Sequence, residues 1–525
     1  MEITFRALTR NEYLPSTGKS TVFLQYDNWD DFGFETLFRL TVFDEQGNKQ
    51  SVGDVKIGFI GQEQSSTSGK MPRIFNSLEH IYSLGQDADY YHNLMQYLSN
   101  NMRENILKTL GDVVYNSRLL ETVSDETAFS VSLLRSVKLT TVKHQFRRIL
   151  QGEAELTNYD FFFERPSNSI YSGINVCFKV DPTTKPSSNI HILIGRNGVG
   201  KTTLLNNMVD ALIPNRGLEN HAGFFETSNL FGKNRSLNKD YFAGVVSVSF
   251  SAFDPFIPPK DQPNANIGMQ YYYVGLKKYV IETNTWTSKN IEDLSKDFTI
   301  SLGLCFALSS KRSRWIDAIK KLESDLNFAE MDLCQLRNIY VHDYSDGKQQ
   351  FFEKSEALFK RMSSGHAIVL LTITRLVETV EEKTLVLLDE PESHLHPPLL
   401  SAFTRALSDL MDNRNGVAII ATHSPVILQE VPKSCVSIIR RARLIFNVDR
   451  PEIETFAENV GILTREVFGL EVSKSGFHDL LASSVKEGKS YEEIDKEYQY
   501  QLGFEGRVML RSLISIRDSQ VDDEI

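Results

Sequence analysis

A glycine-rich run followed by a lysine and two threonines is the strongest chemical pattern in the sequence. It directly follows the run 189–194, which predicts a strand, and it opens a predicted helix. Glycines let the backbone curl until successive N–H groups face a phosphate, while the lysine reaches the β- and γ-phosphates and a hydroxyl binds Mg²⁺. The residues expected to bind ATP are Gly195, Arg196, Asn197, Gly198, Val199, Gly200, Lys201, Thr202 and Thr203, with Thr202 also a magnesium ligand.

Two adjacent carboxylates form the second pattern. Asp389 and Glu390 end the apolar run 384–388, a predicted strand that delivers both side chains to one edge of a sheet. We expect Asp389 to hold Mg²⁺ through its hydration shell and Glu390 to polarise the water that attacks the γ-phosphate. The alternative is a strand end with two solvated acids, and the phosphate-loop pattern disfavours it.

Two weaker patterns flank the carboxylates. Met362, Ser363, Ser364, Gly365 and His366 open the apolar helix predicted over 367–377, and Thr422, His423 and Ser424 follow another predicted strand. Taken singly, a Ser-Gly helix start is commonly a cap, and a histidine after a strand is commonly structural. The four patterns in this order and spacing nevertheless resemble the ATP-binding cassette (ABC) ATPases.

That resemblance implies roles for the weaker patterns. In ABC ATPases a Leu-Ser-Gly-Gly-Gln signature of one subunit caps the γ-phosphate bound by the other, and a histidine after the last core strand contacts the same phosphate. Ser363, Ser364 and Gly365 match the signature acting in trans, and His423 matches the histidine, which would act beside Glu390 in catalysis. The implied assembly is a homodimer, or a higher oligomer, that sandwiches two ATP molecules.

Departures from the transporter pattern narrow the class. The signature lacks a second glycine and the final glutamine, and Glu390 is followed by Pro-Glu-Ser-His-Leu-His-Pro rather than Thr-Ser-Ala-Leu-Asp. This form resembles the branch of RecF-, OLD- and SMC-like (AAA_21-type) ATPases. The segment 245–256, with Ser251 and Asp254, is the expected place of the residue that couples nucleotide to the sensing subdomain. His394 and His396 could form a metal site, but without an apparent third ligand a subunit-interface role is preferred.

The layout of the whole chain suggests a biological setting. A β-rich start, a helical insert, the 362–366 pattern and a helical tail containing Val467, Phe468, Gly469, Leu470 and Glu471 are similar to the PtuA ATPases of Septu and retron-associated anti-phage systems. The resemblance implies a separately encoded nuclease partner, of HNH type if Septu-like. The alternatives are a RecF-like DNA-clamping ATPase, a transporter ATPase subunit and an autonomous OLD-type nuclease. The last is disfavoured because Asp87-x-Asp89 lies at the wrong end of the chain, where a loop or helix cap is predicted.

The elements that position these residues predict an α/β fold. Apolar runs at 245–250, 385–388 and 417–421 predict central strands of a mostly parallel sheet, and the fold class is an ABC-type P-loop ATPase core with an antiparallel β subdomain and helical insertions. We expect a β-rich N-terminal region with a helical insertion over 1–150, the core over 151–465 with an insertion at about 260–350, and a helical tail over 466–525. In the first region, runs 38–43 and 52–59 predict antiparallel strands.

The composition and charge of the chain limit which partners it is expected to bind. The 525 residues carry 57 Lys plus Arg against 68 Asp plus Glu, so the net charge is −11, which argues against coating nucleic acid through bulk charge. No run is long enough for a membrane helix and no export signal is found, so we expect a cytoplasmic protein without membrane contact. Three basic clusters could touch nucleic acid, although solvated faces or the protein's own carboxylates are the favoured explanation: 135–148, 311–314 and 440–443.

Overall fold

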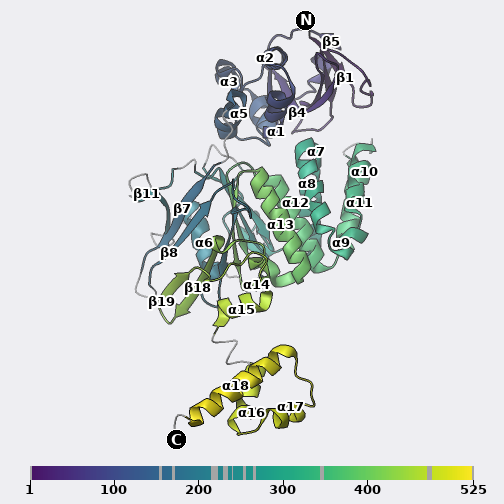
Figure 1. Cartoon of the computed structure of the whole chain (residues 1–525). Helices are drawn as coiled ribbons and strands as arrows, with labels where there is room; N and C mark the ends of the chain where they lie inside the picture. The colour runs from purple at the N-terminus through teal and green to yellow at the C-terminus, as the bar shows by residue number, and fades with distance from the viewer. Residues whose placement is uncertain are drawn as a thin grey trace.

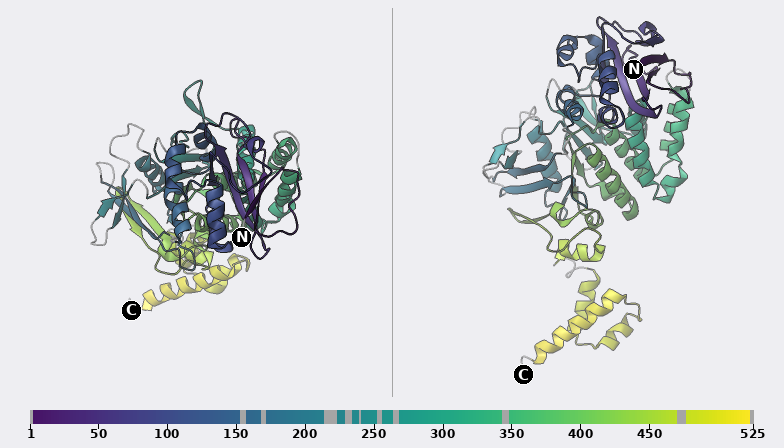
Figure 2. Two further views of the ribbon diagram at one scale, coloured as in Figure 1. Left: turned by 90° about the horizontal axis from the view of Figure 1, so that it is seen from above. Right: turned by 45° about the horizontal axis from the view of Figure 1, so that its top comes forward.

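A computed structural model describes residues 3–152, 157–167, 172–213, 223–228, 234–238, 241–251, 256–263, 268–342, 348–469 and 476–522. An N-terminal α/β domain and a set of C-terminal helices lie at opposite ends of the molecule, with a large sheet and its helices between them (Figure 1; Figure 2, right). No helix of these described residues is both long and apolar enough to cross a membrane.

The N-terminal domain is a six-stranded sheet covered by helices, with strand order β5-β1-β2-β3-β4-β6. Strands β1 and β2 are parallel, and the other neighbours are antiparallel, including the predicted pair β3 and β4. Large side chains such as Phe38, Tyr91 and Phe146 fill its core. The strands are β1 (Thr4–Leu8), β2 (Thr21–Tyr26), β3 (Leu37–Phe43), β4 (Lys49–Phe59), β5 (Ile74–Phe75) and β6 (Ile81–Gly85), and the helices are α1 (Ala88–Tyr97), α2 (Asn100–Thr109), α3 (Ser117–Val123), α4 (Leu139–Thr141) and α5 (Arg147–Gln151).

A seven-stranded sheet forms the centre of the molecule, with strand order β13-β12-β16-β17-β9-β18-β19. All neighbours are parallel except β18 and β19, so the predicted mostly parallel sheet is confirmed. Its inner strands are fully buried on both faces, which explains their unbroken apolar runs. The strands are β9 (Ile190–Ile194), β12 (Gly244–Ser249), β13 (Gln270–Gly275), β16 (Thr384–Asp389), β17 (Val417–Thr422), β18 (Val436–Ala442) and β19 (Ile445–Asp449).

Each face of this sheet packs against a different layer. Alternate side chains such as Ile192, Val386 and Ile420 pack with helices α7 (Ile291–Ala307), α8 (Ser309–Leu322), α12 (Ser364–Thr379) and α13 (Pro397–Asn413). The intervening side chains face helix α6 (Lys201–Leu212) and an antiparallel sheet, β11-β10-β7-β8. This second sheet consists of β7 (Tyr159–Arg165), β8 (Ile174–Val180), β10 (Phe224–Ser228) and β11 (Asn234–Ser236). The fold is therefore an α/β ABC-type P-loop core with an antiparallel β subdomain.

The interval near 260–350 contains strands as well as helices. Strand β13 joins the edge of the central sheet, and β14 (Lys277–Val280) pairs with β15 (Thr285–Ser288) as a hairpin. The helices that follow α8 are α9 (Leu326–Glu330), α10 (Leu336–His342) and α11 (Gln349–Lys360).

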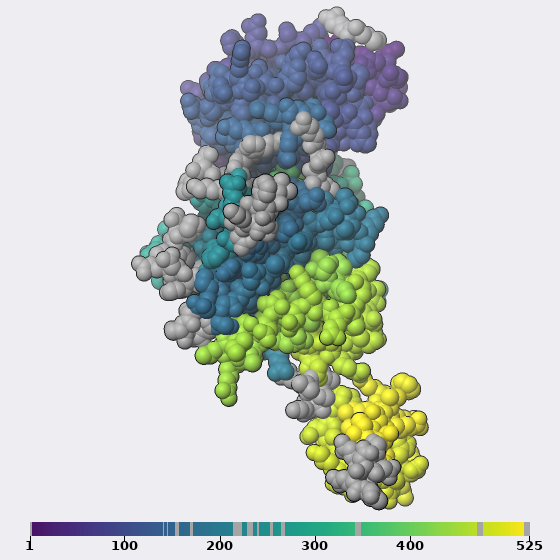
Figure 3. All heavy atoms as spheres, turned by 60° about the vertical axis from the view of Figure 1, so that its left-hand side comes forward, coloured from purple at the N-terminus to yellow at the C-terminus, as the bar shows by residue number. Residues whose placement is uncertain are grey.

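The C-terminal helices form a small unit with its own core. Leu481, Val485, Ile494 and Leu510 are buried there, and the space-filling view shows the unit as a lobe at the far end from the N-terminal domain (Figure 3). Leu470 and Glu471 of the predicted tail pattern lie outside the described residues. The unit consists of α16 (Phe477–Lys486), α17 (Tyr491–Glu497) and α18 (Phe504–Asp522). The preceding α14 (Pro425–Leu428) and α15 (Val460–Phe468) pack on the core of the central sheet instead.

Candidate functional site

The glycine-rich run forms a tight loop between strand β9 and helix α6. Gly198 and Gly200 have φ angles of +78° and +98°, a left-handed conformation that side chains disfavour. A Cβ atom on Gly195 would lie 2.3 Å from the carbonyl oxygen of Ile439 on neighbouring strand β18. Backbone conformation and close packing therefore both require glycine in this loop, and the loop brings the amino end of α6 to the carboxyl edge of the sheet.

Lys201 is held inside this loop. Its side chain is only 3% exposed, and its Nζ donates hydrogen bonds to the carbonyl oxygens of Gly195 at 3.0 Å and Arg196 at 3.1 Å. Glu390 Oε1 lies 4.0 Å from the same Nζ. Burial lowers the pKa of Lys201, and the Glu390 carboxylate opposes that shift. The ammonium group thus sits between loop carbonyls and a carboxylate.

Strand β16 brings the two predicted carboxylates to this loop. Thr202, in the first turn of α6, donates from its hydroxyl to Asp389 Oδ1 at 3.0 Å. Glu390 follows directly, in a left-handed conformation with φ of +45°, and its N–H donates to the carbonyl of Ala421 on β17 at 2.9 Å. That unusual conformation turns the chain at the strand end, so that successive acidic side chains face the loop from one edge.

A third carboxylate, Glu392, organises the predicted histidine and was not assigned a role from the sequence. Its side chain is 6% exposed, and its Oε1 accepts hydrogen bonds from Thr422 Oγ1 at 2.5 Å and from the His423 N–H at 2.7 Å. His423 Nδ1 lies 3.1 Å from Glu392 and 3.7 Å from Glu390. The second acid of the Glu-Pro-Glu run was visible in the sequence, but nothing there indicated which strand it would contact.

The predicted signature residues lie at the start of helix α12. Ser363 is the N-cap of this helix, and its Oγ is 2.6 Å from His366 Nδ1. A Cβ on Gly365 would lie 2.2 Å from the carbonyl oxygen of His394, so the turn after Glu390 packs directly on this glycine. The hydrogen bonds of Ser363 are therefore made with its own helix, and Gly365 contacts the turn after Glu390.

His394 and His396 do not complete a metal site among the described residues. His396 Nε2 lies 3.0 Å from Asp325 Oδ2, an ion-pair geometry, and no described group of three or more His, Cys, Asp or Glu side chains is arranged to hold a metal ion. Of the segment expected to couple nucleotide to the sensing subdomain, Asp254 lies outside the described residues, and Ser251 follows strand β12.

The basic cluster 311–314 was a wrong candidate for nucleic-acid contact. Lys311 pairs with Glu381 at 2.9 Å, and Arg314 pairs with Asp87 at 2.7 Å. The side chain of Arg312 is buried over the ring of Tyr340. The favoured alternative, contact with the protein's own carboxylates, accounts for this cluster.

The first basic side chains of the cluster 135–148 also contact other groups of the protein. Arg135 pairs with Asp31 at 2.6 Å, and the buried Lys138 donates to the carbonyl of Ala243 at 2.8 Å. In contrast, Arg440 and Arg441 on β18 and Arg443 in the turn before β19 are exposed, although Arg440 pairs with Asp449 at 2.7 Å. Of the three clusters, this last one presents the most accessible cations.

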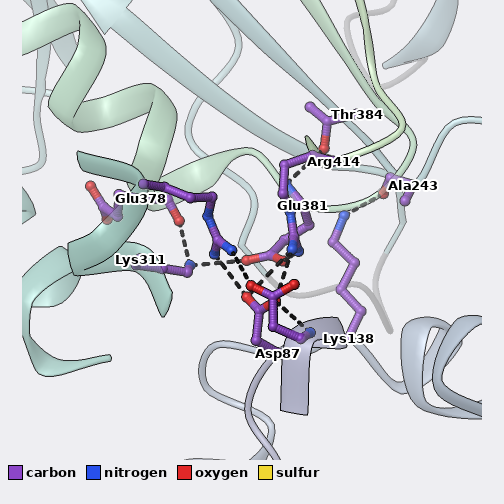
Figure 4. Close-up of polar contacts among 10 residues, drawn as sticks. Asp87, Lys138, Ala243, Lys311, Glu378, Glu381, Thr384 and Arg414 are labelled. Atoms are coloured by element: carbon purple, nitrogen blue, oxygen red, sulfur yellow. Dashed lines mark hydrogen bonds and ion pairs between the residues drawn. The ribbon is translucent and has the colours of Figure 1, made fainter. Parts of the chain in front are cut away.

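Buried ion pairs join the N-terminal domain to the sheet (Figure 4). Asp87, the N-cap of α1 as predicted, lies 2.7 Å from Arg314 and 3.2 Å from Arg414, and Arg414 reaches Glu381 at 2.5 Å. Burial alone would raise the pKa of Asp87, but the two guanidinium groups outweigh it and hold the pKa well below its usual range. Glu381 and Arg414 precede strands β16 and β17, so the domain is anchored at the edge of the sheet opposite the glycine loop.

The phosphate loop, the Thr202–Asp389 contact at the end of β16 and the mostly parallel core define an ABC-class P-loop ATPase. A family model described as "AAA domain, putative AbiEii toxin, Type IV TA system" matches residues 234–429. The chain belongs to the family of protein ea59 of Escherichia phage lambda, with which it is 48% identical over 528 residues, covering 98% of this chain and 99% of the relative.

Two solved structures are similar to part of the chain. The ADP form of MJ1267, an ATP-binding cassette of an ABC transporter, is 11% identical with a TM-score of 0.30, covering 61% of this chain and 100% of the cassette. The SMC head domain from Thermotoga maritima is 9% identical with a TM-score of 0.28, covering 57% of this chain and 100% of the head domain.

Proposed function

We propose that this protein is an ATP-hydrolysing switch that closes as a dimer around two ATP molecules and opens after hydrolysis. The observation that carries the proposal is the convergence of Lys201, Thr202, Asp389, Glu390 and His423 at one edge of the sheet. These side chains come from three separate segments, and each is of the type that phosphoryl transfer requires at its position.

The residues fit a nucleotide and Mg²⁺. Gly195 to Thr203 would cradle the phosphates with backbone N–H groups, and Lys201 would exchange its two loop carbonyl partners for phosphate oxygens. The Thr202 hydroxyl and the Asp389 carboxylate, 3.0 Å apart, are the hard oxygen ligands that Mg²⁺ prefers. When bound, Mg²⁺ would offset the negative charge that develops on the phosphates.

Hydrolysis is assigned to Glu390 and His423. The Glu390 carboxylate would orient and polarise the attacking water, and Lys201 beside it would neutralise phosphate charge. His423, positioned by Glu392, would contact the γ-phosphate. Ser363, Ser364 and Gly365 would complete the site of the partner subunit, in keeping with the ABC class.

We further propose that the switch controls a separately encoded nuclease, as in the Septu-like anti-phage arrangement. The C-terminal unit supplies a surface for a partner protein, because Phe477, Leu480, Phe504 and Val508 are exposed there at 46%, 59%, 86% and 52%.

A second candidate, a DNA-clamping ATPase of RecF type, is favoured by the exposed Arg440, Arg441 and Arg443. If the protein is a DNA clamp, replacing all three arginines by alanine should abolish its ATP-dependent binding to duplex DNA. If these arginines take no part in partner binding, the same variant should capture a nuclease like the wild type.

Two variants test the switch itself. Lys201→Ala should weaken ATP binding by on the order of a hundredfold or more, because the phosphates lose their cation. Glu390→Gln should still bind ATP but accumulate as a dimer, measured by sedimentation with and without ATP. Equal ATP affinity in the wild type and Lys201→Ala, or an unchanged sedimentation coefficient for Glu390→Gln, would refute the proposal.

A further inference from the structure

A continuous chain of polar contacts begins at the predicted signature serine and ends at a histidine of another segment. Ser363 Oγ lies 2.6 Å from His366 Nδ1, and His366 Nε2 lies 3.1 Å from Asp325 Oδ1. The other oxygen of Asp325 lies 3.0 Å from His396 Nε2. Asp325 and His366 are 6% and 15% exposed, so the inner contacts are shielded from water, whereas His396 is 48% exposed.

The Asp325 carboxylate fixes which ring nitrogen of His366 carries hydrogen. Asp325 also caps helix α9, where its Oδ1 accepts the N–H of Phe328 at 3.0 Å. Burial raises the pKa of Asp325, but this N–H and the His366 ring outweigh it, so the net shift is downward and the group is ionised near neutral pH. An ionised carboxylate can only accept hydrogen bonds, so His366 Nε2 must carry hydrogen.

The proton count at His366 then decides what Ser363 can do. If His366 is neutral, its hydrogen is on Nε2 and its Nδ1 is an acceptor, so the Ser363 hydroxyl must donate its hydrogen to Nδ1. A phosphate oxygen is an acceptor, and the serine then has no hydrogen to offer it. If His366 carries a second proton, Nδ1 donates to Ser363 Oγ instead, and the hydroxyl hydrogen is released.

We propose that His366 is a positioning residue that must take up a proton before Ser363 can donate its hydroxyl hydrogen to the γ-phosphate held by a partner subunit. This inference rests on the sandwich dimer proposed above and adds a regulation to it: closing of the dimer is linked to proton uptake at the signature. His366 occupies the place of the glutamine in the ABC signature, and glutamine cannot take up a proton in this way.

Three groups face His366 from the elements packed against it. Asp325 faces the ring from the start of α9, the Phe328 ring lies 5.3 Å from it, and His396 faces it from the turn after Glu390, with 6.4 Å between the ring centroids. Only a doubly protonated His366 leaves the Ser363 hydroxyl hydrogen free for an incoming phosphate oxygen. A phosphate arriving from the partner subunit therefore promotes protonation, and protonation in turn promotes closing.

The first experiment measures ATP-driven dimerisation of Glu390→Gln at about pH 6 and about pH 8, the range in which histidine titrates. The dimer dissociation constant should rise with pH, by up to about tenfold per pH unit for each His366 that takes up a proton. Adding His366→Gln to the Glu390→Gln background should remove this slope, the dependence of the dimer dissociation constant on pH. In Glu390→Gln/His396→Gln, the matched control that removes the other histidine on Asp325, the slope should persist.

A second measurement needs no change at His366. Calorimetry of ATP-driven closing of Glu390→Gln, repeated in buffers of different ionisation enthalpy, should show about one proton taken up per closed site at the higher pH. No proton uptake, or an unchanged slope in the His366→Gln double variant, overturns the role of His366 while leaving the dimer intact. If Glu390→Gln binds ATP but forms no dimer at either pH, the sandwich itself is refuted and the linkage with it.

Discussion

Thr202 Oγ1 donates a hydrogen bond to Asp389 Oδ1 at 3.0 Å, although 187 positions separate the two residues along the chain. The contact joins the first turn of helix α6 to the end of strand β16. It places a hydroxyl and a carboxylate where a single Mg²⁺ could use the first directly and the second through water.

Thr202→Val should therefore weaken ATP binding only when Mg²⁺ is present. Valine keeps the branched shape of threonine but removes the hydroxyl ligand, so we expect a loss of about tenfold or more in affinity for Mg-ATP. Titrations of a fluorescent ATP analogue with Mg²⁺ and with a chelator measure the two affinities. Thr202→Ser, which keeps the hydroxyl, is the matched control and should bind Mg-ATP like the wild type. An equal loss with and without the metal would contradict the assignment.

Glu392→Gln should slow hydrolysis without weakening ATP binding. The Glu392 carboxylate holds His423 through its N–H at 2.7 Å and faces Nδ1 at 3.1 Å, so losing the charge should leave the imidazole poorly oriented. We expect kcat to fall on the order of tenfold, while the ATP dissociation constant changes by less than about twofold. Steady-state ATPase assays and nucleotide titrations provide the two values.

A double variant separates this role from a general loss of structure. If Glu392 acts through His423, then Glu392→Gln should add little to the defect of His423→Gln. Fully additive losses in kcat would show that Glu392 acts independently of the histidine, and would contradict its positioning role.

The sequence was most informative where local pattern and fold coincide. The glycine loop, the strand that ends at Asp389 and Glu390, and the antiparallel pair β3 and β4 are all encoded within short windows, by glycine at positive φ or by unbroken apolar runs. Strand β13 was not predicted from the sequence. Its apolar run of three tyrosines and one valine is short, and it lies inside the long segment between two clearer strands.

Long-range ionic contacts could not be predicted in the same way. The sequence shows Lys311 and Arg314 as an exposed-looking basic run, but their carboxylate partners Glu381 and Asp87 lie 70 and 227 positions away. The contacts of Asp325 with His366 and His396 have the same character, since 41 positions separate Asp325 from His366. The sequence shows the sign of each charged side chain, whereas its ion-pair partner depends on how the chain folds.

Asp87→Asn should destabilise the contact between the N-terminal domain and the ATPase core. Asparagine is as good an N-cap as aspartate, so helix α1 keeps its cap while Arg314 and Arg414 lose their shared anion. Removing one member of a buried ion pair costs about 3–5 kcal/mol. Urea denaturation and limited proteolysis between the domains measure the loss.

Asp89→Asn is the matched control for this network. Asp89 lies in the same turn and 3.7 Å from Arg314, but its side chain is 51% exposed, so the loss should stay below about 1 kcal/mol. Similar losses for both variants would mean that the buried pairs do not anchor the domain.

Asp112→Asn should stabilise the protein increasingly as pH rises from about 4 to 7. Asp112 is 1% exposed, accepts the N–H groups of Val114 and Tyr115 at 2.9 and 3.0 Å, and accepts the hydroxyl of Tyr91 at 3.0 Å. Burial raises its pKa from 3.8 to about 7, and the backbone N–H groups only partly oppose this. The folded chain thus keeps a proton that the unfolded chain has lost, so wild-type stability falls through this pH window and levels off above it.

The size of this effect follows from the two pKa values of Asp112. The shift from 3.8 to about 7 corresponds to at most roughly 4 kcal/mol, which the neutral asparagine should recover above pH 7. Urea denaturation of both proteins at about pH 5 and about pH 8 measures it, and the difference between variant and wild type should be larger at the higher pH. Asp125→Asn, a change at an exposed carboxylate nearby, should show no such pH-dependent difference. If Asp112→Asn shows the same difference from wild type at both pH values, Asp112 is ionised in the folded protein throughout this range, and its Tyr91 contact is that of a carboxylate.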